Sequence, residues 1–504
     1  MNPKELDNAY QEKKQKFHDY IDSVKKNSPW DIYTIINPTL IKNPYTSDFP
    51  KNYFINSSEF SNRIINFTKN SFKFYIKNLY LLFSYFMAFV LYKIYFKKQK
   101  KNEPKIIIDT FGLVDKTNKE KVFNENYFAD IYKIFERFET QYAILPRLYG
   151  VGKNPWKLVR FFSIINQDSR DFVFEYEFLK LRDFALLFVL VVLYPFKTLR
   201  LLQKESTIDD KTFNNSLVED IKHFSFDSLT RYILGKNLTK IESIEKIYSW
   251  SEFQVIERSF NFAVRKNRSA IKLIACQFYL NYETYFNTYV DDLDYEMLSA
   301  PHEVLVNGKR YLLDREKVEY NTGVSLRYKS IFDFKGIKEE RNILLLGSYI
   351  EKDTQHMLES VKEFDNVIFK NHPAVDIKKF GVLPKNVTVS NENIYKLFEH
   401  AKLVIGTASG TSVEAVACGV SVIIIASRNN LTANPLVAHG QGKIWDIAFE
   451  IEDVNGIYTK LMEFRVNHKD EIKEISVWYK DNFFVEPTEE NIIKIFELNM
   501  RNEK

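Results

Sequence analysis

The sequence predicts an α/β fold with two doubly wound domains and a helical N-terminal extension. Short apolar runs alternate with helical patterns from residue 342 to 425, the arrangement of a parallel sheet with crossover helices. An earlier apolar run, Lys105–Thr110, ends in polar residues, as the first strand of such a domain does. The chain has 504 residues, which is enough for two large domains.

The composition is that of a globular protein, with 45% hydrophobic and 27% charged residues. A net charge of +5 is small for this length, so we expect no nucleic-acid partner. The two cysteines, Cys276 and Cys418, both lie in apolar surroundings. They leave no disulfide framework or zinc motif and indicate a reducing compartment. The charged start of the chain lacks the apolar core of a secretory signal.

Residues 1–104 form the predicted extension, and its apolar segment 79–92 has lysines on both sides. A second apolar segment, 184–196, also has basic flanks but belongs to the first domain as an insertion. Each is shorter than the roughly 20 residues that span a bilayer. Three interpretations stay open: buried core helices, attachment in the plane of an anionic membrane, or a span of the first segment extended by snorkelling lysines.

The first doubly wound domain is predicted over residues 105–335. Residues 209–237 are polar and indicate a linker or a helical insertion. The later elements are a helix over Ser251–Lys266, a strand over Ala270–Tyr279, a loop, strand and turn over Leu298–Gly308, and a hinge over Ile331–Asn342.

The second domain is predicted over residues 336–482, followed by a C-terminal helix within 483–504 that a proline opens. Its alternating elements imply right-handed crossovers. The strands are expected at 342–347, 366–370, 386–389, 402–405 and 421–425, and the helices at 354–363, 394–400 and 412–418.

A phosphate-binding turn is predicted where the buried strand before Gly406 meets the next helix. Small and hydroxyl residues at this junction allow a phosphate to approach the backbone. The candidate substrate-binding residues here are Ser409, Gly410, Thr411, Ser412 and Glu414. Lys370 and His372 end the preceding strand and are candidates for the same phosphate. An ordinary helix cap at Ser409–Ser412 is the alternative.

These segments resemble the bacterial surface-carbohydrate glycosyltransferases of the GT-B fold, which build lipopolysaccharide O-antigen and capsule. The resemblance rests on Lys370-Asn371-His372-Pro373 and the Ser409–Glu414 turn, and covers roughly residues 240–450. Further matches are the segments 344–350, around Cys276, and 299–311. The chain departs from the pattern at Phe278, where the family often has His.

The resemblance implies transfer of a sugar from a nucleotide-sugar donor to a lipid-linked or glycan acceptor, at the cytoplasmic face of the bacterial inner membrane. It implies no cofactor and no metal, and a role for Glu414 at the ribose. The candidate bases are Asp109, then Glu252, then His302, and the acidic segment Asp291–Asp294 is expected to be a solvated loop. The alternatives are a nucleotide-sugar 2-epimerase of the same fold and a non-catalytic member of a polysaccharide assembly complex.

Overall fold

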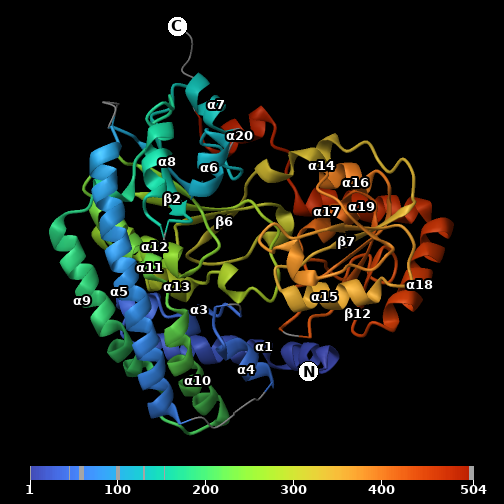
Figure 1. Ribbon diagram of the computed structural model, residues 1–504, viewed down its shortest axis with the longest axis horizontal. Coiled ribbons are helices and arrows are strands. Elements are labelled where there is room, and N and C mark those ends of the chain that lie inside the picture. Colours follow the sequence, from blue (N-terminus) through green and yellow to red (C-terminus); the bar gives the residue numbers. More distant parts are fainter. Residues whose placement is uncertain are drawn as a thin grey trace.

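The computed structural model describes residues 2–44, 46–55, 62–97, 103–128, 131–151, 154–268, 270–428 and 430–498. Residues 499–504, the end of the predicted C-terminal segment, lie outside this range. Two six-stranded parallel sheets, each covered by helices, form two domains that face one another (Figure 1). The expected two-domain, GT-B-like α/β architecture with N-terminal helices is confirmed.

The first sheet has the order β2-β1-β3-β4-β5-β6. Its strands are β1 (Ile106–Leu113), β2 (Tyr142–Tyr149), β3 (Lys246–Trp250), β4 (Lys272–Gln277), β5 (Glu303–Val306) and β6 (Glu319–Thr322). All neighbours pair in parallel. Its helices are α6 (Val114–Glu120), α7 (Ile131–Arg137), α8 (Lys157–Ile165), α9 (Leu181–Thr198), α10 (Ile208–Glu219), α11 (Phe226–Leu238), α12 (Val255–Asn267) and α13 (Asp292–Glu296).

The second sheet has the order β12-β11-β10-β7-β8-β9, so the strand order reverses between β7 and β10. Ligands of such sheets bind beyond the carboxyl ends of the strands at this switch point. The strands are β7 (Asn342–Leu346), β8 (Val367–Lys370), β9 (Val387–Val389), β10 (Ala401–Gly406), β11 (Ser421–Ile425) and β12 (Trp445–Ala448). The helices are α14 (Lys329–Asp333), α15 (Glu351–Ser360), α16 (Ile394–Phe398), α17 (Thr411–Ala417), α18 (Asp453–Asn467) and α19 (Lys469–Phe483), and α20 (Glu489–Ile495) follows them in the chain but packs on the first domain.

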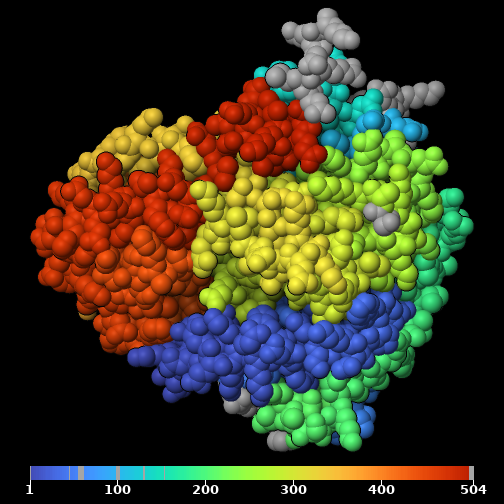
Figure 2. All heavy atoms as spheres, turned by 180° about the vertical axis from the view of Figure 1, so that it is seen from behind, coloured from blue at the N-terminus to red at the C-terminus, as the bar shows by residue number. Residues whose placement is uncertain are grey.

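The N-terminal helices pack on both domains. They are α1 (Pro3–Lys26), α2 (Ile32–Ile35), α3 (Pro38–Ile41), α4 (Phe49–Ile55) and α5 (Arg63–Tyr95). Figure 2 shows the dark blue residues at the start of the chain running below the orange-red second domain and the yellow-green first domain. Leu6 and Tyr10 share a hydrophobic cluster with Phe286 of the first domain and Leu431 of the second.

A buried ion-pair cluster joins α1 to the first domain. Lys25 Nζ lies 2.8 Å from Asp294 Oδ1, and Arg258 Nη1 lies 2.7 Å from the same oxygen. The two cations offset the burial of Asp294 and hold its pKa well below its usual range. The expectation of a solvated acidic loop is therefore wrong for Asp294, whose side chain is buried, while Asp291 caps α13.

The chain passes between the two domains twice, after β6 and after α19, and these two crossing segments lie side by side. Ser325, after β6, and Val485, after α19, exchange hydrogen bonds of 2.9 Å. Gly308 lies against Phe483 so closely that a Cβ at this position would stand 2.4 Å from its backbone carbon. After the second crossing, α20 returns to the first domain, beside α7 (Figure 1). The two crossings are therefore held against each other by direct backbone and side-chain contacts.

Several elements differ from the sequence expectation. Strands β2, β3, β6 and β12 were not predicted, and β1 extends to Leu113 instead of ending at Thr110. Of the two interpretations of residues 209–237, the helical insertion is correct, since α10 and α11 occupy this segment and bury many of their side chains.

Candidate functional site

A cavity of about 410 Å³ lies between the two domains. Residues that follow β3 and β4 line it from the first domain, and residues that follow β7, β8 and β10 line it from the second. Both walls are the carboxyl edges of parallel sheets, where α/β proteins bind ligands. The lining residues are Glu252, Gln254, Tyr279, Leu280, Tyr282, Tyr285, Thr288, Arg327, Tyr328, Tyr349, His372, Ala408, Gly410, Thr411 and Glu414.

The predicted phosphate turn forms part of the second-domain wall. Gly410 and Thr411 line the cavity, whereas Ser409 and Ser412 are not among its lining residues. The Ser412 hydroxyl is fully buried with no hydrogen-bond partner in the described part of the chain, and its N–H donates to the Ser409 carbonyl at 3.1 Å. Ser409 and Ser412 thus shape the turn, while Gly410 and Thr411 face the cavity.

Gly410 meets the first domain directly. A Cβ at this position would lie 3.2 Å from Cβ of Leu280, in the segment that follows β4. Even a methyl group here would require Leu280 to move by a few tenths of an ångström, and a larger side chain would need more room. The absence of a side chain at Gly410 therefore allows the cleft to close on the turn.

His372 lies two residues beyond the end of β8 and lines the cavity. Its Nδ1 accepts the Ala374 N–H at 3.2 Å, so the proton of the neutral ring lies on Nε2. Burial lowers the pKa of His372 from 6.5, which keeps the ring neutral at pH 7. Nε2–H is therefore a fixed donor for a phosphate or sugar oxygen.

Lys370 does not line the cavity. Its Nζ donates to the Glu392 carbonyl at 2.5 Å. The two candidates are thus separated, because Lys370 is the last residue of β8 whereas His372 lies in the loop that follows. The structure brings His372 but not Lys370 to the cleft.

Glu414 on α17 is buried at the cavity wall. It accepts a hydrogen bond from the Tyr395 hydroxyl. Burial raises its pKa, and the Tyr395 hydrogen bond and the charge of Arg327 oppose the rise. One wall of the cavity thus carries an oriented carboxylate that can accept hydrogen bonds from the hydroxyl groups of a ligand.

Sequence reasoning missed Arg327, which lies in the 3₁₀ turn η6 (Leu326–Tyr328) after β6. Its guanidinium lies 5.4 Å from the ring centres of both Tyr127 and Trp250, a cation–π arrangement that holds the charge at the cavity. Its charge acts on two carboxylates of the cavity wall, Glu252 and Glu414, and lowers the pKa of each against the rise caused by burial. No local motif marks this arginine, because its partners are far away in the sequence.

Glu252 follows β3 and lines the cavity from the first domain, opposite the phosphate turn. Burial raises its pKa, while the charges of Arg147 and Arg327 work against the rise. A carboxylate with a raised pKa in a cleft is suited to accept a proton near neutral pH. Of the three candidate bases, Glu252 is the one that the structure brings to the cavity.

Asp109 lies instead in the interior. It is the fourth residue of β1, and the strand continues beyond it, so it does not face the strand end. Arg147 Nε and Nη2 donate to its two oxygens at 3.0 Å, and Arg231 Nη2 donates at 2.6 Å. Burial alone would raise the pKa of Asp109, but the two guanidinium groups hold it below its usual value. Both oxygens of the Asp109 carboxylate already accept hydrogen bonds from arginines, so the group is not available as a base.

His302 lies just before β5, at the amino ends of the strands of the first sheet. Its Nδ1 accepts the Leu273 N–H at 2.9 Å, and burial together with Arg265 and Lys272 lowers its pKa to about 4. The amino ends of parallel strands point away from the cleft. His302 is therefore not brought to the cavity.

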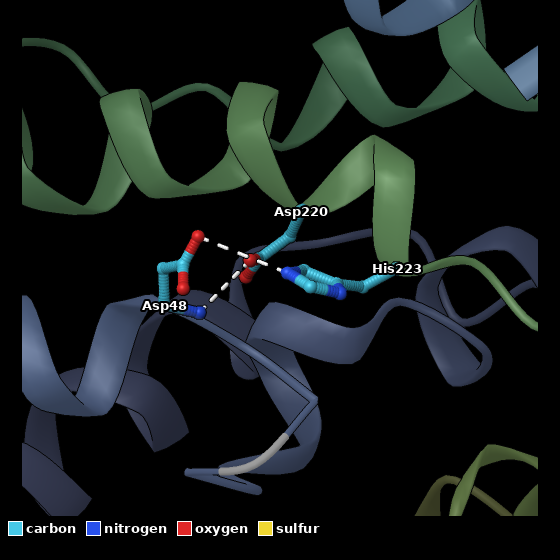
Figure 3. A group of neighbouring side chains, drawn as sticks. All are labelled: Asp48, Asp220 and His223. Atoms are coloured by element: carbon cyan, nitrogen blue, oxygen red, sulfur yellow. Dashed lines mark hydrogen bonds and ion pairs between the residues drawn. The ribbon is translucent and has the colours of Figure 1, made fainter. Parts of the chain in front are cut away.

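A separate cluster joins Asp48 to Asp220 and His223 of η3 (Asp220–His223), as Figure 3 shows. The Lys222 ammonium lies 2.8 Å from Asp48 Oδ2, where a cation would bind. Asp220 already accepts hydrogen bonds from Asp48 N–H and from two hydroxyls, those of Ser47 and Thr39. These donors satisfy the carboxylates, so the cluster fastens the N-terminal helices to η3 and does not fit a metal ion.

No protein-family model and no curated protein matches the chain. Among solved structures, MurG of Acinetobacter baumannii aligns with a TM-score of 0.44 and 14% identity, over 78% of this chain and 100% of MurG. The UDP-GlcNAc 2-epimerase of Methanocaldococcus jannaschii, in complex with UDP-GlcNAc and UDP, aligns with a TM-score of 0.42 and 12% identity, over 78% and 99%. The glycosyltransferase VinC, in complex with dTDP, aligns with a TM-score of 0.39 and 10% identity, over 78% and 100%.

Proposed function

We propose that this chain is a glycosyltransferase that moves a sugar from a nucleotide-sugar donor to an acceptor hydroxyl in the cleft. One observation carries the proposal: a single interdomain cavity is lined by the carboxylate of Glu252 and the cation Arg327 from the first domain and by the hydrogen-bond donor His372 from the second. These are the groups that a displacement at a sugar phosphate needs.

The donor phosphates fit against Gly410 and Thr411. The small residues leave room for them, His372 Nε2–H donates a hydrogen bond, and Arg327 offsets their charge. The helix α17 has only seven residues, so the charged and hydrogen-bonding side chains carry most of the stabilisation. In this arrangement Glu414 accepts hydrogen bonds from the ribose hydroxyls.

In the transfer step the acceptor oxygen attacks the anomeric carbon and forms the new glycosidic bond. The bond from that carbon to the phosphate oxygen breaks, and the nucleoside phosphate leaves with the electron pair. Glu252 takes the proton of the acceptor hydroxyl. His372 and Arg327 stabilise the negative charge that grows on the leaving phosphate.

We further propose that the acceptor is a lipid-linked or glycan precursor of a bacterial surface polysaccharide, O-antigen or capsule, and that the protein works at the cytoplasmic face of the inner membrane. The support is the resemblance of the residue 240–450 segments to enzymes of this kind, together with two apolar helices with basic neighbours.

Nucleotide binding tests the proposal. The full-length protein is titrated with UDP, GDP, CMP and dTDP and their sugars, with melting temperature and calorimetry as readouts. His372→Ala and Arg327→Ala should each weaken nucleotide binding at least about tenfold, because each removes a charge-assisted hydrogen bond to the phosphates. Lys370→Ala is the matched control and should bind normally. If none of these ligands binds the wild-type protein, the proposal is wrong.

A product assay separates transfer from epimerisation. With UDP-GlcNAc alone, a 2-epimerase inverts the sugar without any acceptor, whereas a transferase releases nucleotide in proportion to glycosylated acceptor. Release of nucleotide that depends on an acceptor supports the proposal. Epimerised sugar formed in the absence of acceptor would assign the cleft to the alternative activity.

A further inference from the structure

Two helices of the first domain expose one apolar face. Helices α5 and α9 lie side by side at the outer edge of this domain, away from the second domain (Figure 1). Both are long and apolar enough to cross a membrane by length and composition alone. The Tyr75 hydroxyl of α5 donates to the Val192 carbonyl of α9 at 2.9 Å, and Phe184 of α9 packs on Phe86 and Phe89.

The inner faces of both helices belong to the core of the domain. Phe74, Tyr85 and Tyr92 of α5 and Leu187 and Tyr194 of α9 are buried in one cluster with residues of the first domain. A helix that spans a bilayer would have to lift these side chains out of the core. The packing therefore opposes a span and leaves only the outer faces for contact.

The outer face of α5 carries an apolar stripe through the middle of the helix. Residues spaced three and four apart lie on one side of a helix. Phe72, Ile76, Leu79 and Phe83 follow this spacing and are exposed, with 67% of Phe72 and 62% of Phe83 accessible. A soluble monomer rarely leaves such a stripe open to water, and water contact with it is costly.

The outer face of α9 continues the stripe. Its exposed large side chains are Leu181, Phe188, Val189, Leu193 and Phe196. Phe196 also meets Phe67 of α5, with ring centres 6.3 Å apart, so the two faces are contiguous. We call this surface, made of the exposed apolar side chains of α5 and α9, the apolar platform.

Basic side chains border the apolar platform. Lys73, Lys93 and Arg182 are exposed, and α5 contains no acidic residue. Lys93 lies over the rings of Phe89 and Tyr92, with its ammonium 5.3 and 5.4 Å from their centres. An apolar stripe flanked by lysines with aromatic neighbours matches the interface of a bilayer that carries anionic lipid.

We propose that the apolar platform docks on the surface of an anionic lipid bilayer, with α5 and α9 lying in the membrane plane. The apolar side chains enter the boundary between headgroups and acyl chains, and the basic side chains meet lipid phosphates. The inference rests on the proposed function only for the choice of the cytoplasmic membrane. Vesicle binding and nucleotide binding are measured separately, so either can fail alone.

Vesicle flotation of the full-length protein tests the platform. Wild-type protein should float with phosphatidylglycerol-containing vesicles and bind phosphatidylcholine vesicles at least about tenfold more weakly. The double variant Phe72→Ser/Phe83→Ser should lose at least about tenfold in binding, since each Phe gives up buried apolar surface. The matched control is Val382→Ser/Val466→Ser, which removes two side chains of the second domain that are 99% and 69% exposed.

Three results would overturn the proposal. One is wild-type protein that stays unbound with anionic vesicles. Another is a dimer in solution that Phe72→Ser/Phe83→Ser converts to a monomer, which would assign the platform to a second copy. The last is resistance of the membrane-bound protein to alkaline extraction, which indicates a span. If the variants unfold, hydrogen exchange of the wild type decides, since vesicles should protect 63–95 and 181–198 and spare the second domain.

Discussion

The hydroxyls of Tyr285 in the first domain and Tyr349 in the second lie 2.9 Å apart and share a hydrogen bond across the cleft. Both tyrosines line the interdomain cavity. The bond joins the segment after β4 to the end of β7, so it forms only when the domains are closed on the site.

Loss of this hydrogen bond should loosen the closed state. Tyr285→Phe and Tyr349→Phe each remove one hydroxyl, and a neutral hydrogen bond contributes about 0.5–1.5 kcal/mol, or roughly two- to tenfold in nucleotide affinity. The double variant should cost little more than either single one, since both report the same bond. Calorimetric titration with nucleotide measures the cycle. Tyr149→Phe, at an exposed tyrosine, is the control; fully additive losses would mean that the two hydroxyls act independently.

Closure also depends on Gly410. Gly410→Val places methyl groups where Leu280 already lies, since a Cβ at this position would stand 3.2 Å from Cβ of Leu280. We expect the variant to hold the cleft open, with an increased radius of gyration in solution scattering and weaker nucleotide binding. Adding Leu280→Ala should partly restore the radius of gyration and the nucleotide affinity, because the smaller side chain leaves space for the valine. A variant that closes and binds as the wild type does would refute the packing argument.

Glu252→Gln tests the base. Removing a general base should reduce transfer about 10²- to 10⁴-fold while nucleotide binding stays within a factor of two or so. In the wild type, burial raises the pKa of Glu252 above 4.5, so the rate should fall on the acid side at a pH higher than an exposed glutamate would give. His302→Gln, at the far edge of the sheet, is the control and should transfer normally. Equal losses in both variants would argue against a specific role for Glu252.

Asp109→Asn should affect stability. The substitution leaves Arg147 and Arg231 without their shared buried anion, which costs about 3–5 kcal/mol in the free energy of unfolding. The native pKa of Asp109 lies below 3.8, so its contribution is complete above that pH and is lost only as the pH falls through the lowered value.

Urea denaturation at pH 7 and at pH 4 measures this contribution, which should be similar at both. Asp115→Asn breaks an exposed ion pair with Lys157 and serves as the matched control, with a cost below about 1 kcal/mol. Equal stability of the Asp109 and Asp115 variants would contradict the assignment of Asp109 to the core.

The second domain could be read from the sequence because its strands are uninterrupted apolar runs with small residues at their ends. The first domain was harder. Strand β2 contains Pro146 and Arg147, which break the pattern, yet an edge strand tolerates a proline and Arg147 is neutralised inside by Asp109 and Glu257. That long-range pairing has no signature in local sequence.

The candidate site divides in the same way. Residues of the turn and the strand end, such as Gly410 and His372, follow from local pattern and lie at the cavity. Arg327 does not, because its place depends on the rings of Tyr127 and Trp250. Asp109 looked like a strand-end residue only because the strand was expected to stop at Thr110. The apolar segments could not be placed without knowing how their inner faces pack.

The return of α20 to the first domain has a consequence for biosynthesis. Phe496 packs its ring against Tyr248 and Phe135, with ring centres 4.9 and 5.7 Å apart, inside the core of the domain that is translated first. That core cannot be completed until Phe496 has left the ribosome. The nascent first domain therefore keeps an unfilled apolar gap while the second domain is synthesised, and a chain that stops before α20 should be aggregation-prone although its second domain can form.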